Sequence, residues 1–375
     1  SLKAVYMSCA SQATINSRVF RSCGSLGSIG MPSNVTYTPT TPKRLSGDCG
    51  LPGALLPALD ANGHLEIPEG TLMVPNTYYG SSALKSVHVA STVTLIGDQA
   101  FGGCVNLVNV TFAANSVLST VGFGAFSSSG VVSVDIPDAT KTFHDKAFYA
   151  CASLRSVSFT SQSQLALLST YAFGSCTALS SFAVPDTVTS IDSYCFTSTS
   201  GLKTVTFGSA SALTAIGSSA FSSSGLTTMT VPSAVVTIGN SAFSSCSALK
   251  SMYMNLINSQ LTSIGSSAFY SCSSLKFVYF DYSSSQLTSI GGSAFSYSGL
   301  VGFAIPESVT LVSDYAFAYC SSLKAVYMSC ASQATINSRA FRSSPGLMSI
   351  GLPASVRYTG SPLRLSNCAI PGGVP

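Results

Sequence analysis

The sequence predicts an α/β repeat solenoid, with parallel strands forming a sheet on one face and short helical or 3-10 turns closing the other. One observation is a pattern of roughly Leu-x-x-Val-x-Phe, a turn and Ile-Gly-x-x-Ala-Phe-x-x-Cys, which returns every 22 to 26 residues. Another is that each unit joins an alternating stretch to a stretch of near-helical spacing. Units of this size cannot bury their apolar faces alone, so they must stack into one array.

One aromatic residue in each unit is expected to anchor the core. The anchors are Phe20, Phe101, Phe126, Phe148, Phe173, Phe196, Phe221, Phe243, Phe269, Phe295, Phe317 and Phe341. Tyr79 takes the same slot one period before Phe101. Strands stacked at about 4.8 Å from Tyr79 to Phe341 would give a rod on the order of 60 Å long.

Each unit begins with its strand. Between residues 202 and 207, Val205 and Phe207 share one face and Thr206 takes the other, which is typical of a half-buried strand. The Ile-Gly-x-x-Ala-Phe-x-x-Cys stretch follows, with its apolar residues at near-helical spacing. We therefore predict a helical or 3-10 turn on the convex side of every coil.

Two kinds of unit alternate over much of the chain. In one kind a proline follows the strand, because proline fixes φ and lacks a donor and so suits a strand exit. These prolines are Pro137, Pro185, Pro232, Pro306 and Pro353. The other kind has a Ser-rich loop at this point, at 161–165, 208–213 and 283–287.

The repeat pattern divides the chain into four parts. Residues 51–78 are predicted to be an N-terminal cap, because their turn-rich stretch 59–64 has no repeat signature. A solenoid of about twelve coils is expected over residues 79–358, and residues 359–375 are interpreted as a C-terminal cap or linker. Residues 1–50 are then interpreted as the tail of an upstream module, which consists of its last repeats and its C-terminal cap.

One segment occurs twice almost unchanged. Residues 1–22 match residues 322–343 at 21 of 22 positions, and only Val19 and Ala340 differ. Other units share only their buried anchors, so identity that extends to outward residues indicates duplication of a module with a period near 321 residues. We expect the chain to come from a longer tandem array; an artefact that repeats the segment is the alternative.

The repeat pattern resembles the BspA-like leucine-rich repeats of bacterial and protist surface proteins. The resemblance covers residues 1–36 and about 65–358. It implies a right-handed leucine-rich-repeat coil, exported to the cell surface and used in adhesion or protein interaction. It carries over no catalytic residues. The chain differs from this family in its Ser richness and its duplicated module, and both features argue against a simple host adhesin.

Composition limits the possible partners. Only 8% of the residues are charged, and the net charge of +4 is too small and too spread out to predict nucleic-acid binding. Mean hydropathy is +0.41, yet no stretch approaches the roughly 20 continuous apolar residues that span a bilayer. We therefore predict no transmembrane segment.

The cysteines fall into two groups. Seven of them lie three residues after an anchor, and this periodic slot favours buried, reduced thiols. They are Cys23, Cys104, Cys151, Cys176, Cys246, Cys272 and Cys320. Outside the slot, Cys330 with Cys368 and Cys9 with Cys49 recur between the modules. Each of these pairs is interpreted either as a disulfide that ties the cap to the last coils or as buried free thiols.

Residues that carry chemistry are few. His64, His88 and His144 are the only histidines, none has the spacing of metal ligands, and each is expected on the surface. No nucleophile elbow or phosphate-binding loop occurs. The chain is predicted to be no enzyme and to use no cofactor or metal. Asn34 begins a glycosylation sequon on an expected loop.

A recurrent outward pattern marks the predicted sheet. A basic residue follows the first strand leucine in several units, at Lys3, Lys85, Arg155, Lys203, Lys250, Lys276 and Lys324. Tyrosines take the outward slot between two buried strand residues, at Tyr6, Tyr253, Tyr279 and Tyr327. An acidic residue follows the strand-exit proline at Glu69, Asp138, Asp186 and Glu307. The basic residues and tyrosines predict either a surface for protein or glycan partners or a solvated face that resists edge pairing.

These patterns favour a non-enzymatic extracellular structural protein whose modules join end to end into a surface filament or coat. Its partners would be copies of itself or adjoining modules, because Ser1 opens in the middle of a repeat and an open apolar edge invites a neighbour. The alternative is a cell-surface adhesin that binds a host or matrix protein or a glycan. Its site would be the face around Lys250, Tyr253, Lys276, Tyr279, Lys324 and Tyr327, with Lys203 and Arg155 beside it.

Overall fold

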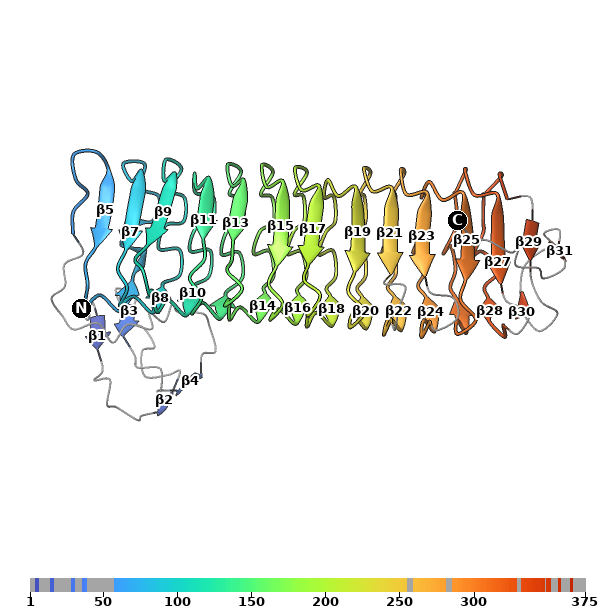
Figure 1. Ribbon diagram of the computed structural model, residues 1–375, viewed down its shortest axis with the longest axis horizontal. Coiled ribbons are helices and arrows are strands. Elements are labelled where there is room, and N and C mark those ends of the chain that lie inside the picture. Colours follow the sequence, from blue (N-terminus) through green and yellow to red (C-terminus); the bar gives the residue numbers. More distant parts are fainter. Residues whose placement is uncertain are drawn as a thin grey trace.

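From His64 onward the chain forms an elongated coil whose strands follow one another along a rod (Figure 1). The computed structural model describes residues 57–254, 259–280, 285–328 and 332–347, and the backbone of seven short strands outside these ranges. Four of those strands pair in parallel as β1 with β3 and β2 with β4. They are β1 (Ala4–Tyr6), β2 (Thr14–Asn16), β3 (Ser28–Gly30) and β4 (Thr36–Thr38).

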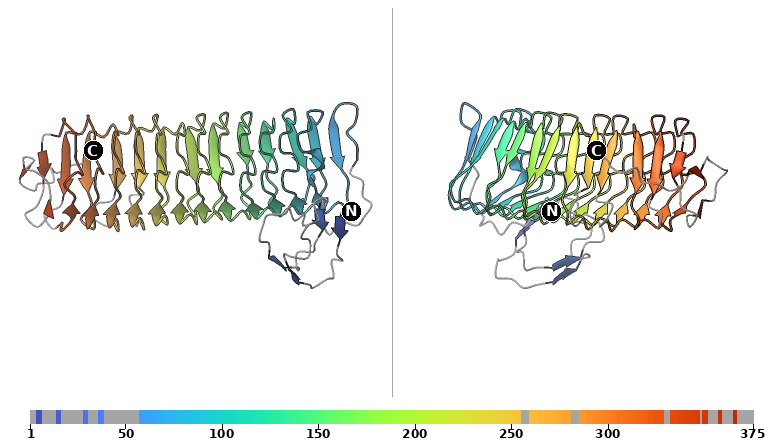
Figure 2. Two further views of the ribbon diagram at one scale, coloured as in Figure 1. Left: turned by 180° about the vertical axis from the view of Figure 1, so that it is seen from behind. Right: turned by 45° about the vertical axis from the view of Figure 1, so that its right-hand side comes forward.

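Each coil contributes two strands, which form two stacks of parallel strands along the rod (Figure 2). The longer strands form what we name the long-strand face: β5 (His64–Ile67), β7 (Ser86–Val89), β9 (Asn109–Phe112), β11 (Ser133–Asp135), β13 (Ser156–Ser158), β15 (Ser181–Val184), β17 (Thr204–Phe207), β19 (Thr228–Val231), β21 (Ser251–Met254), β23 (Phe277–Phe280), β25 (Gly302–Ile305), β27 (Ala325–Met328), β29 (Ser349–Gly351) and β31 (Leu365–Ser366). This face confirms the predicted parallel sheet.

The second stack is a continuous 13-stranded parallel sheet, which we name the short-strand sheet. Its strands have two residues each: β6 (Met73–Val74), β8 (Leu95–Ile96), β10 (Thr120–Val121), β12 (Thr142–Phe143), β14 (Leu167–Leu168), β16 (Ser190–Ile191), β18 (Ala215–Ile216), β20 (Thr237–Ile238), β22 (Ser263–Ile264), β24 (Ser289–Ile290), β26 (Leu311–Val312), β28 (Thr335–Ile336) and β30 (Arg357–Tyr358). The Ile of the Ile-Gly motif therefore ends a strand, which the sequence did not predict.

The long-strand face is interrupted where a coil with a Ser-rich loop precedes a coil with a strand-exit proline. Its strands group as β5 to β13, β15 with β17, β19 to β23, and β25 to β31. Pro185, Pro232 and Pro306 follow the first strand of the second, third and fourth group. Proline has no N–H to donate to the preceding coil, so the ladder weakens at these junctions.

The core is one column of stacked rings with aliphatic residues around it. The anchors from Phe101 to Phe341 are buried, and consecutive rings lie 5.0 to 5.5 Å apart between centroids. Phe143, Phe182 and Phe303 approach the column edge-on or tilted. This arrangement confirms that the periodic residues form one core.

The prediction of helical or 3-10 turns on the convex side is wrong. Within the described residues the one helix is η1 (Asn76–Tyr78), a 3-10 turn. The motif forms isolated turns instead: Ala100 N–H donates to Gly97 O at 3.2 Å, whereas Phe101 N–H donates to Ala125 O of the next coil at 2.7 Å. Most coils contain two residues with left-handed backbone (positive φ), and such residues interrupt an α-helix. Examples are Gln99, Lys146, Tyr171, Ser219, Ser223 and Tyr297. We name these turns the turn column.

The slot expected for Tyr79 is taken by its neighbour. Tyr78 is 8% exposed, and its ring lies 6.1 Å from that of Phe101, whereas Tyr79 is 59% exposed. Tyr78 lies four residues after Val74, whereas Phe101 lies five residues after Ile96. The first coil is thus one residue shorter here, and the helix η1 carries Tyr78 inward.

The cysteine slot holds hydrogen-bond donors as well as compact side chains. The six described cysteines of this slot are free and buried: Cys104, Cys151, Cys176, Cys246, Cys272 and Cys320. The thiol of each donates a hydrogen bond of 2.9 to 3.1 Å to a backbone carbonyl of the preceding coil. Ser344 donates in the same way to Phe317 O at 2.8 Å. Burial raises the pKa of the Cys104 and Cys320 thiols, which favours the protonated donor.

Cys246 provides a test of this slot. Its thiol donates to Phe221 O at 3.0 Å, so Cys246→Ser keeps a donor and Cys246→Ala removes it. We expect the alanine variant to be about 1 kcal/mol less stable than the serine variant, because a net hydrogen bond contributes about that much. Urea unfolding followed by circular dichroism measures both. Equal stability of the two variants would mean that the slot selects for size alone.

Candidate interaction surface

The predicted basic residues occupy one slot at the entrance of the long strands. We name Lys85, Arg155, Lys203, Lys250, Lys276 and Lys324 the basic row; all six are exposed. Lys276 N–H donates to Lys250 O at 2.9 Å, so these two lie in adjacent coils. Thr227 lies between Lys203 and Lys250 in the same slot, and its backbone bonds to both. The row is therefore discontinuous, with its closest cations at Lys250 and Lys276.

The predicted tyrosines divide into a pair and a single residue. Tyr253 on β21 and Tyr279 on β23 are register partners, and their rings stack at 4.8 Å and 9°. Phe277, 44% exposed, lies 5.9 Å from Tyr279. Tyr327 on β27 has Ala304 as its partner on β25, so it does not join this pair.

The pair is half-buried and flanked by Lys250 and Lys276. The two rings stack on each other and Phe277 lies against Tyr279, and within the described residues no hydrogen bond engages either tyrosine hydroxyl. Such a group suits a partner that offers apolar area together with carboxylates or hydrogen-bond acceptors. The structure therefore brings together the central part of the predicted site and separates its ends.

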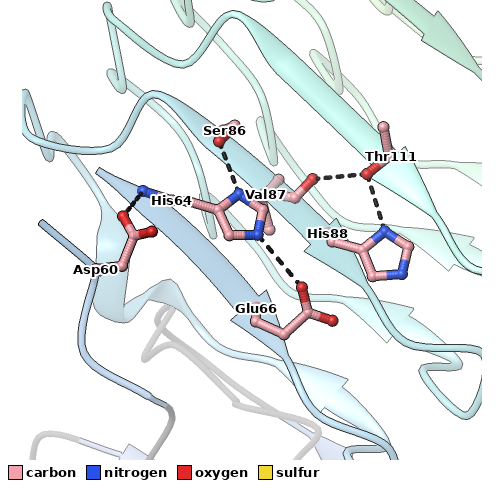
Figure 3. A network of polar contacts seen from close by, with 7 residues as sticks. All are labelled: Asp60, His64, Glu66, Ser86, Val87, His88 and Thr111. Atoms are coloured by element: carbon pink, nitrogen blue, oxygen red, sulfur yellow. Dashed lines mark hydrogen bonds and ion pairs between the residues drawn. The ribbon is translucent and has the colours of Figure 1, made fainter. Parts of the chain in front are cut away.

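Polar residues occupy the other end of the long-strand face (Figure 3). His64 Nδ1 lies 2.8 Å from Ser86 Oγ on β7, and its Nε2 lies 3.3 Å from Glu66 Oε2. Asp60 accepts the backbone N–H of His64 at 2.8 Å, and this bond lowers the pKa of the Asp60 carboxyl. Glu66 stays exposed at the end of this network.

The other two histidines have surface positions, as the sequence predicts. His88 is the register partner of Glu66, and its Nδ1 lies 2.9 Å from Thr111 Oγ1 on β9 (Figure 3). His144 follows β12 and is exposed. Among the described residues no three His, Cys, Asp or Glu side chains form a group suited to a metal ion.

Two of the acidic residues after the strand-exit prolines, Glu69 and Asp138, bond to the coil that follows. Glu69 accepts Ser91 N–H at 2.9 Å and Ser91 Oγ–H at 3.0 Å, and these bonds lower the pKa of the Glu69 carboxyl. Asp138 accepts the Thr160 hydroxyl, and Asp186 is exposed. These residues are ordinary turn residues that also carry negative charge onto the long-strand face.

Among the notches on the long-strand face, two lie beside coils with a strand-exit proline. One of about 400 Å³ lies between β9 and β11 and is lined by Val110, Thr111, Phe112, Asn115, Asp135, Pro137 and neighbouring residues. The other, of about 430 Å³, lies between β17 and β19 and is lined by Thr204, Phe207, Met229, Pro232 and neighbouring residues. The second notch lies where the ladder is interrupted between β17 and β19, whereas β9 and β11 stay paired at Ser133 and Asn109.

The sequence reasoning missed a second aromatic surface, on the turn column. Lys146 Nζ lies 5.7 Å from the ring centroids of Phe123 and Tyr171 and 5.9 Å from that of Tyr149. Tyr171 stacks on Tyr194 at 4.7 Å. The available signal was tyrosine two residues before the anchor, at Tyr171, Tyr194 and Tyr315. These rings cover the turns of neighbouring coils.

Some predicted sites lie outside the described residues. They are the candidate disulfide cysteines Cys330, Cys368, Cys9 and Cys49, and the sequon residue Asn34. The disulfides and the glycosylation therefore stay predictions. The described part of the chain contains no helix with the length and apolar character needed to cross a membrane.

A family model for the BspA type leucine-rich repeat region matches the chain in six copies. The matches cover residues 1–41, 72–167, 166–283 and 255–369, which is most of the chain. The chain belongs to the BspA type leucine-rich repeat family. This confirms the family that the repeat pattern resembles, and members of leucine-rich repeat families are generally non-enzymatic modules of protein interaction.

Solved structures agree with this BspA type repeat fold. A leucine-rich repeat protein from Bacteroides ovatus is 22% identical with a TM-score of 0.57, over 94% of this chain and 88% of that one. The pneumococcal vaccine antigen PcpA is 20% identical with a TM-score of 0.51, over 74% of this chain and 69% of that one. At these identities the likeness concerns the fold. No curated protein matches the BspA type chain.

Proposed function

We propose that the chain is part of a non-enzymatic extracellular structural protein, whose solenoid modules join end to end into a surface filament or coat. The observation that carries this proposal is the near-identity of residues 1–22 and 322–343, at 21 of 22 positions. Packing explains identity only at buried positions. Lys324, Arg339 and Arg342 are exposed, and each has an identical counterpart in the first copy.

The duplication supports a tandem array with a period near 321 residues. In this proposal residues 1–50 end one module, residues 51–78 cap the next, and residues 79–358 and 359–375 form its solenoid and its terminal segment. Coil-to-coil bonding supports extension, because the short-strand sheet and the ring column continue from coil to coil along the described solenoid.

Electron microscopy of the purified chain at high concentration tests the proposal. We expect regular fibres or lateral coats. Discrete rods at every concentration would overturn it. Intact mass of the natural product gives a second readout, because a mass near 38.5 kDa would contradict a longer array. A multiple of one module supports it.

A cell-surface adhesin is the second candidate. The Tyr253 and Tyr279 pair beside Lys250 and Lys276 favours it, and a solved structure of similar fold is described as a vaccine antigen. In this reading the long-strand face binds a host or matrix protein or a glycan. Binding to immobilised matrix proteins, lost in a Tyr253→Ala/Tyr279→Ala variant but kept in Tyr194→Ala, would support it.

A further inference from the structure

The long-strand face has a basic edge and an acidic edge. Its strands run across the rod in one direction, so their entrances share one edge and their exits share the other (Figure 1). The basic row lies along the entrance edge, at Lys85, Arg155, Lys203, Lys250, Lys276 and Lys324. The carboxylates that follow the strand-exit prolines lie along the exit edge, at Glu69, Asp138, Asp186 and Glu307. Charge therefore changes sign across the width of the rod.

The carboxylates of the exit edge reach over the next coil. Glu69 accepts two hydrogen bonds from Ser91, which lies just beyond the end of β7. Asp138 accepts the hydroxyl of Thr160, which lies just beyond the end of β13. Each negative charge is thus held at the exit of the coil that follows its own.

Asp186 is placed in the same way, because a Cβ at Gly208, directly after β17, would collide with the Asp186 carboxylate. The coils of β7, β13 and β17 thus each receive a carboxylate at the exit, and their entrances carry Lys85, Arg155 and Lys203. Five residues of extended strand, about 16 Å, separate Lys203 from Gly208. The opposite charges of one coil are therefore too far apart to pair with each other.

We propose that the long-strand face docks onto the same face of a second copy of this chain, with the two rods parallel and related by a twofold axis along the rod. A half-turn about this axis keeps the order of the coils and reverses the direction of the strands. Each coil then meets its own equivalent, with the entrance of one copy over the exit of the other. This pairing deepens the proposed self-assembly and rests on it for the identity of the partner.

The half-turn brings opposite charges together. With the axis over the second residue of each strand, the residue before a strand lies over the fourth residue of the facing strand. The carboxylates lie one or two residues further along, a step of about 3 to 7 Å that a lysine or arginine side chain spans. A twofold contact is self-complementary, so each pair occurs twice. The pairs are Lys85 with Glu69, Arg155 with Asp138, and Lys203 with Asp186.

The outward residues of the strands match under the same half-turn. The first and third side chains of a strand point outward, and the half-turn places the first over the third. Glu66 then meets His64, and Asp135 meets Ser133. The other coils bring uncharged side chains together, for example Thr204 with Thr206, Gly302 with Ala304, Ala325 with Tyr327, and Phe277 with Tyr279. Among the described residues of β5 to β27 no like charges face each other.

The face is large enough for a stable dimer. Strands β5 to β27 stack at about 4.8 Å and are each about 13 Å long, which gives an area on the order of 750 Å² per copy. Each partner of a standard interface buries about 800 Å². Two sheets with nearly aligned strands pack about 10 Å apart, so the faces can pair without a change in the coils.

Other arrangements of two copies fit less well. A twofold axis along the strands would make the rods antiparallel and keep the strand direction, so the basic edge of one copy would lie over the basic edge of the other. Rods placed side by side bring a basic edge to an acidic edge, but they leave the face uncovered and repeat without limit. The axis along the rod satisfies the edges and the face together.

Sedimentation velocity and small-angle X-ray scattering of the full chain test the pairing. We expect a dimer with the maximum dimension of one rod and a doubled cross-section. It should weaken between about 0.01 M and 1 M salt, because the Debye length falls from about 30 Å to about 3 Å. A monomer at every salt concentration, or a dimer of doubled length, would overturn the pairing.

Charge reversal tests whether the two edges meet. Lys85→Glu/Arg155→Glu/Lys203→Glu turns six attractive contacts into repulsive ones and should weaken the dimer at least about tenfold. Glu69→Lys/Asp138→Lys/Asp186→Lys should do the same. An equimolar mixture of the two variants should associate again, because each supplies the charge that the other lacks. A mixture that stays monomeric would overturn the facing of the edges.

A matched variant controls for net charge. Lys141→Glu/Arg339→Glu/Arg342→Glu makes the same change of charge at exposed residues away from the long-strand face, and it should retain the dimer. If it dissociates as well, net charge rather than the edges drives association, and the proposal fails.

Thr206→Arg separates face-to-face contact from side-by-side contact. Thr206 is an exposed outward residue of β17, so a bulky cation there should weaken the dimer at least about tenfold. Thr214→Arg makes the same change at an exposed residue of the same coil, just before β18, and should leave the dimer intact. A dimer that survives Thr206→Arg would overturn the pairing of the faces.

Electron microscopy of the same variants separates this pairing from the proposed function. Fibres that persist in the charge-reversed and Thr206→Arg variants would leave the filament standing without the pairing. Dimers that never form fibres would leave the pairing standing without the filament.

Discussion

Phe243→Ala is expected to lower the free energy of unfolding by about 3 to 5 kcal/mol, the range for removing a buried phenylalanine. The Phe243 side chain is fully buried, and its ring stacks on Phe221 at 5.3 Å and on Phe269 at 5.2 Å. The substitution leaves a gap in the column that the flanking coils cannot fill, because their own rings are held by further neighbours. Urea unfolding followed by circular dichroism measures the loss.

Phe277→Ala provides the matched control. Phe277 lies on the long-strand face, is 44% exposed and touches the Tyr279 ring at its surface. Its truncation is expected to change the free energy of unfolding by less than about 1 kcal/mol, because exposed substitutions leave no cavity. If both variants lost the same stability, the column would not be the main support of the fold.

The core could be predicted from the sequence because burial repeats with the coil. From Phe101 onward each coil places its anchor five residues after the apolar residue that ends its short strand, and these side chains can only point inward if the coils stack. Phe182, Val205 and Ile216 are buried with them, each at most 6% exposed. A period of 22 to 26 residues therefore determines a core without any knowledge of coil geometry.

The turn column could not be predicted, because its apolar spacing fits a helix as well as a chain of separate turns. The decisive feature is left-handed backbone, which sequence rules assign to glycine and asparagine. Here serine, tyrosine and lysine hold it, as at Ser219, Tyr171 and Lys146 with φ of 54°, 57° and 61°. The hydrogen bonds to the next coil that hold these residues form only after stacking, so a single unit shows no sign of them.

The surface was predictable in composition but not in arrangement. The sequence placed lysines in one slot and tyrosines in another, and the structure confirms their common face. Which of them adjoin depends on neighbouring coils. Lys250 meets Lys276 because two long coils follow each other there, while Ala304 separates Tyr279 from Tyr327. The notches likewise depend on the junction between two kinds of coil, which no single repeat contains.

Gly225→Ala is expected to destabilise the fold by about 1 to 3 kcal/mol, the usual cost of overpacking. A Cβ at Gly225 would lie 2.0 Å from Ser200 O, a backbone atom of the preceding coil that cannot move without breaking the stack. Gly225 N–H also donates to Thr199 O at 3.1 Å. Gly130, Gly201 and Gly299 meet a backbone carbonyl equally closely, at 2.1 to 2.2 Å.

Gly302→Ala is the control, since a Cβ there finds its nearest neighbour, Ala325 O, at an ordinary 3.7 Å. It should leave stability unchanged or raise it by up to about 1 kcal/mol by restricting the unfolded chain.

Gly225 lies at the junction of β17 and β19, where the long-strand face is already interrupted. A repeat array is stabilised by its coils and by the contacts between neighbours. Weakening the contact between the two coils that meet at Gly225 should therefore split the thermal unfolding of Gly225→Ala into two transitions, one for the coils on each side. A single transition at the temperature of the unsubstituted chain would show that the close approach imposes no constraint.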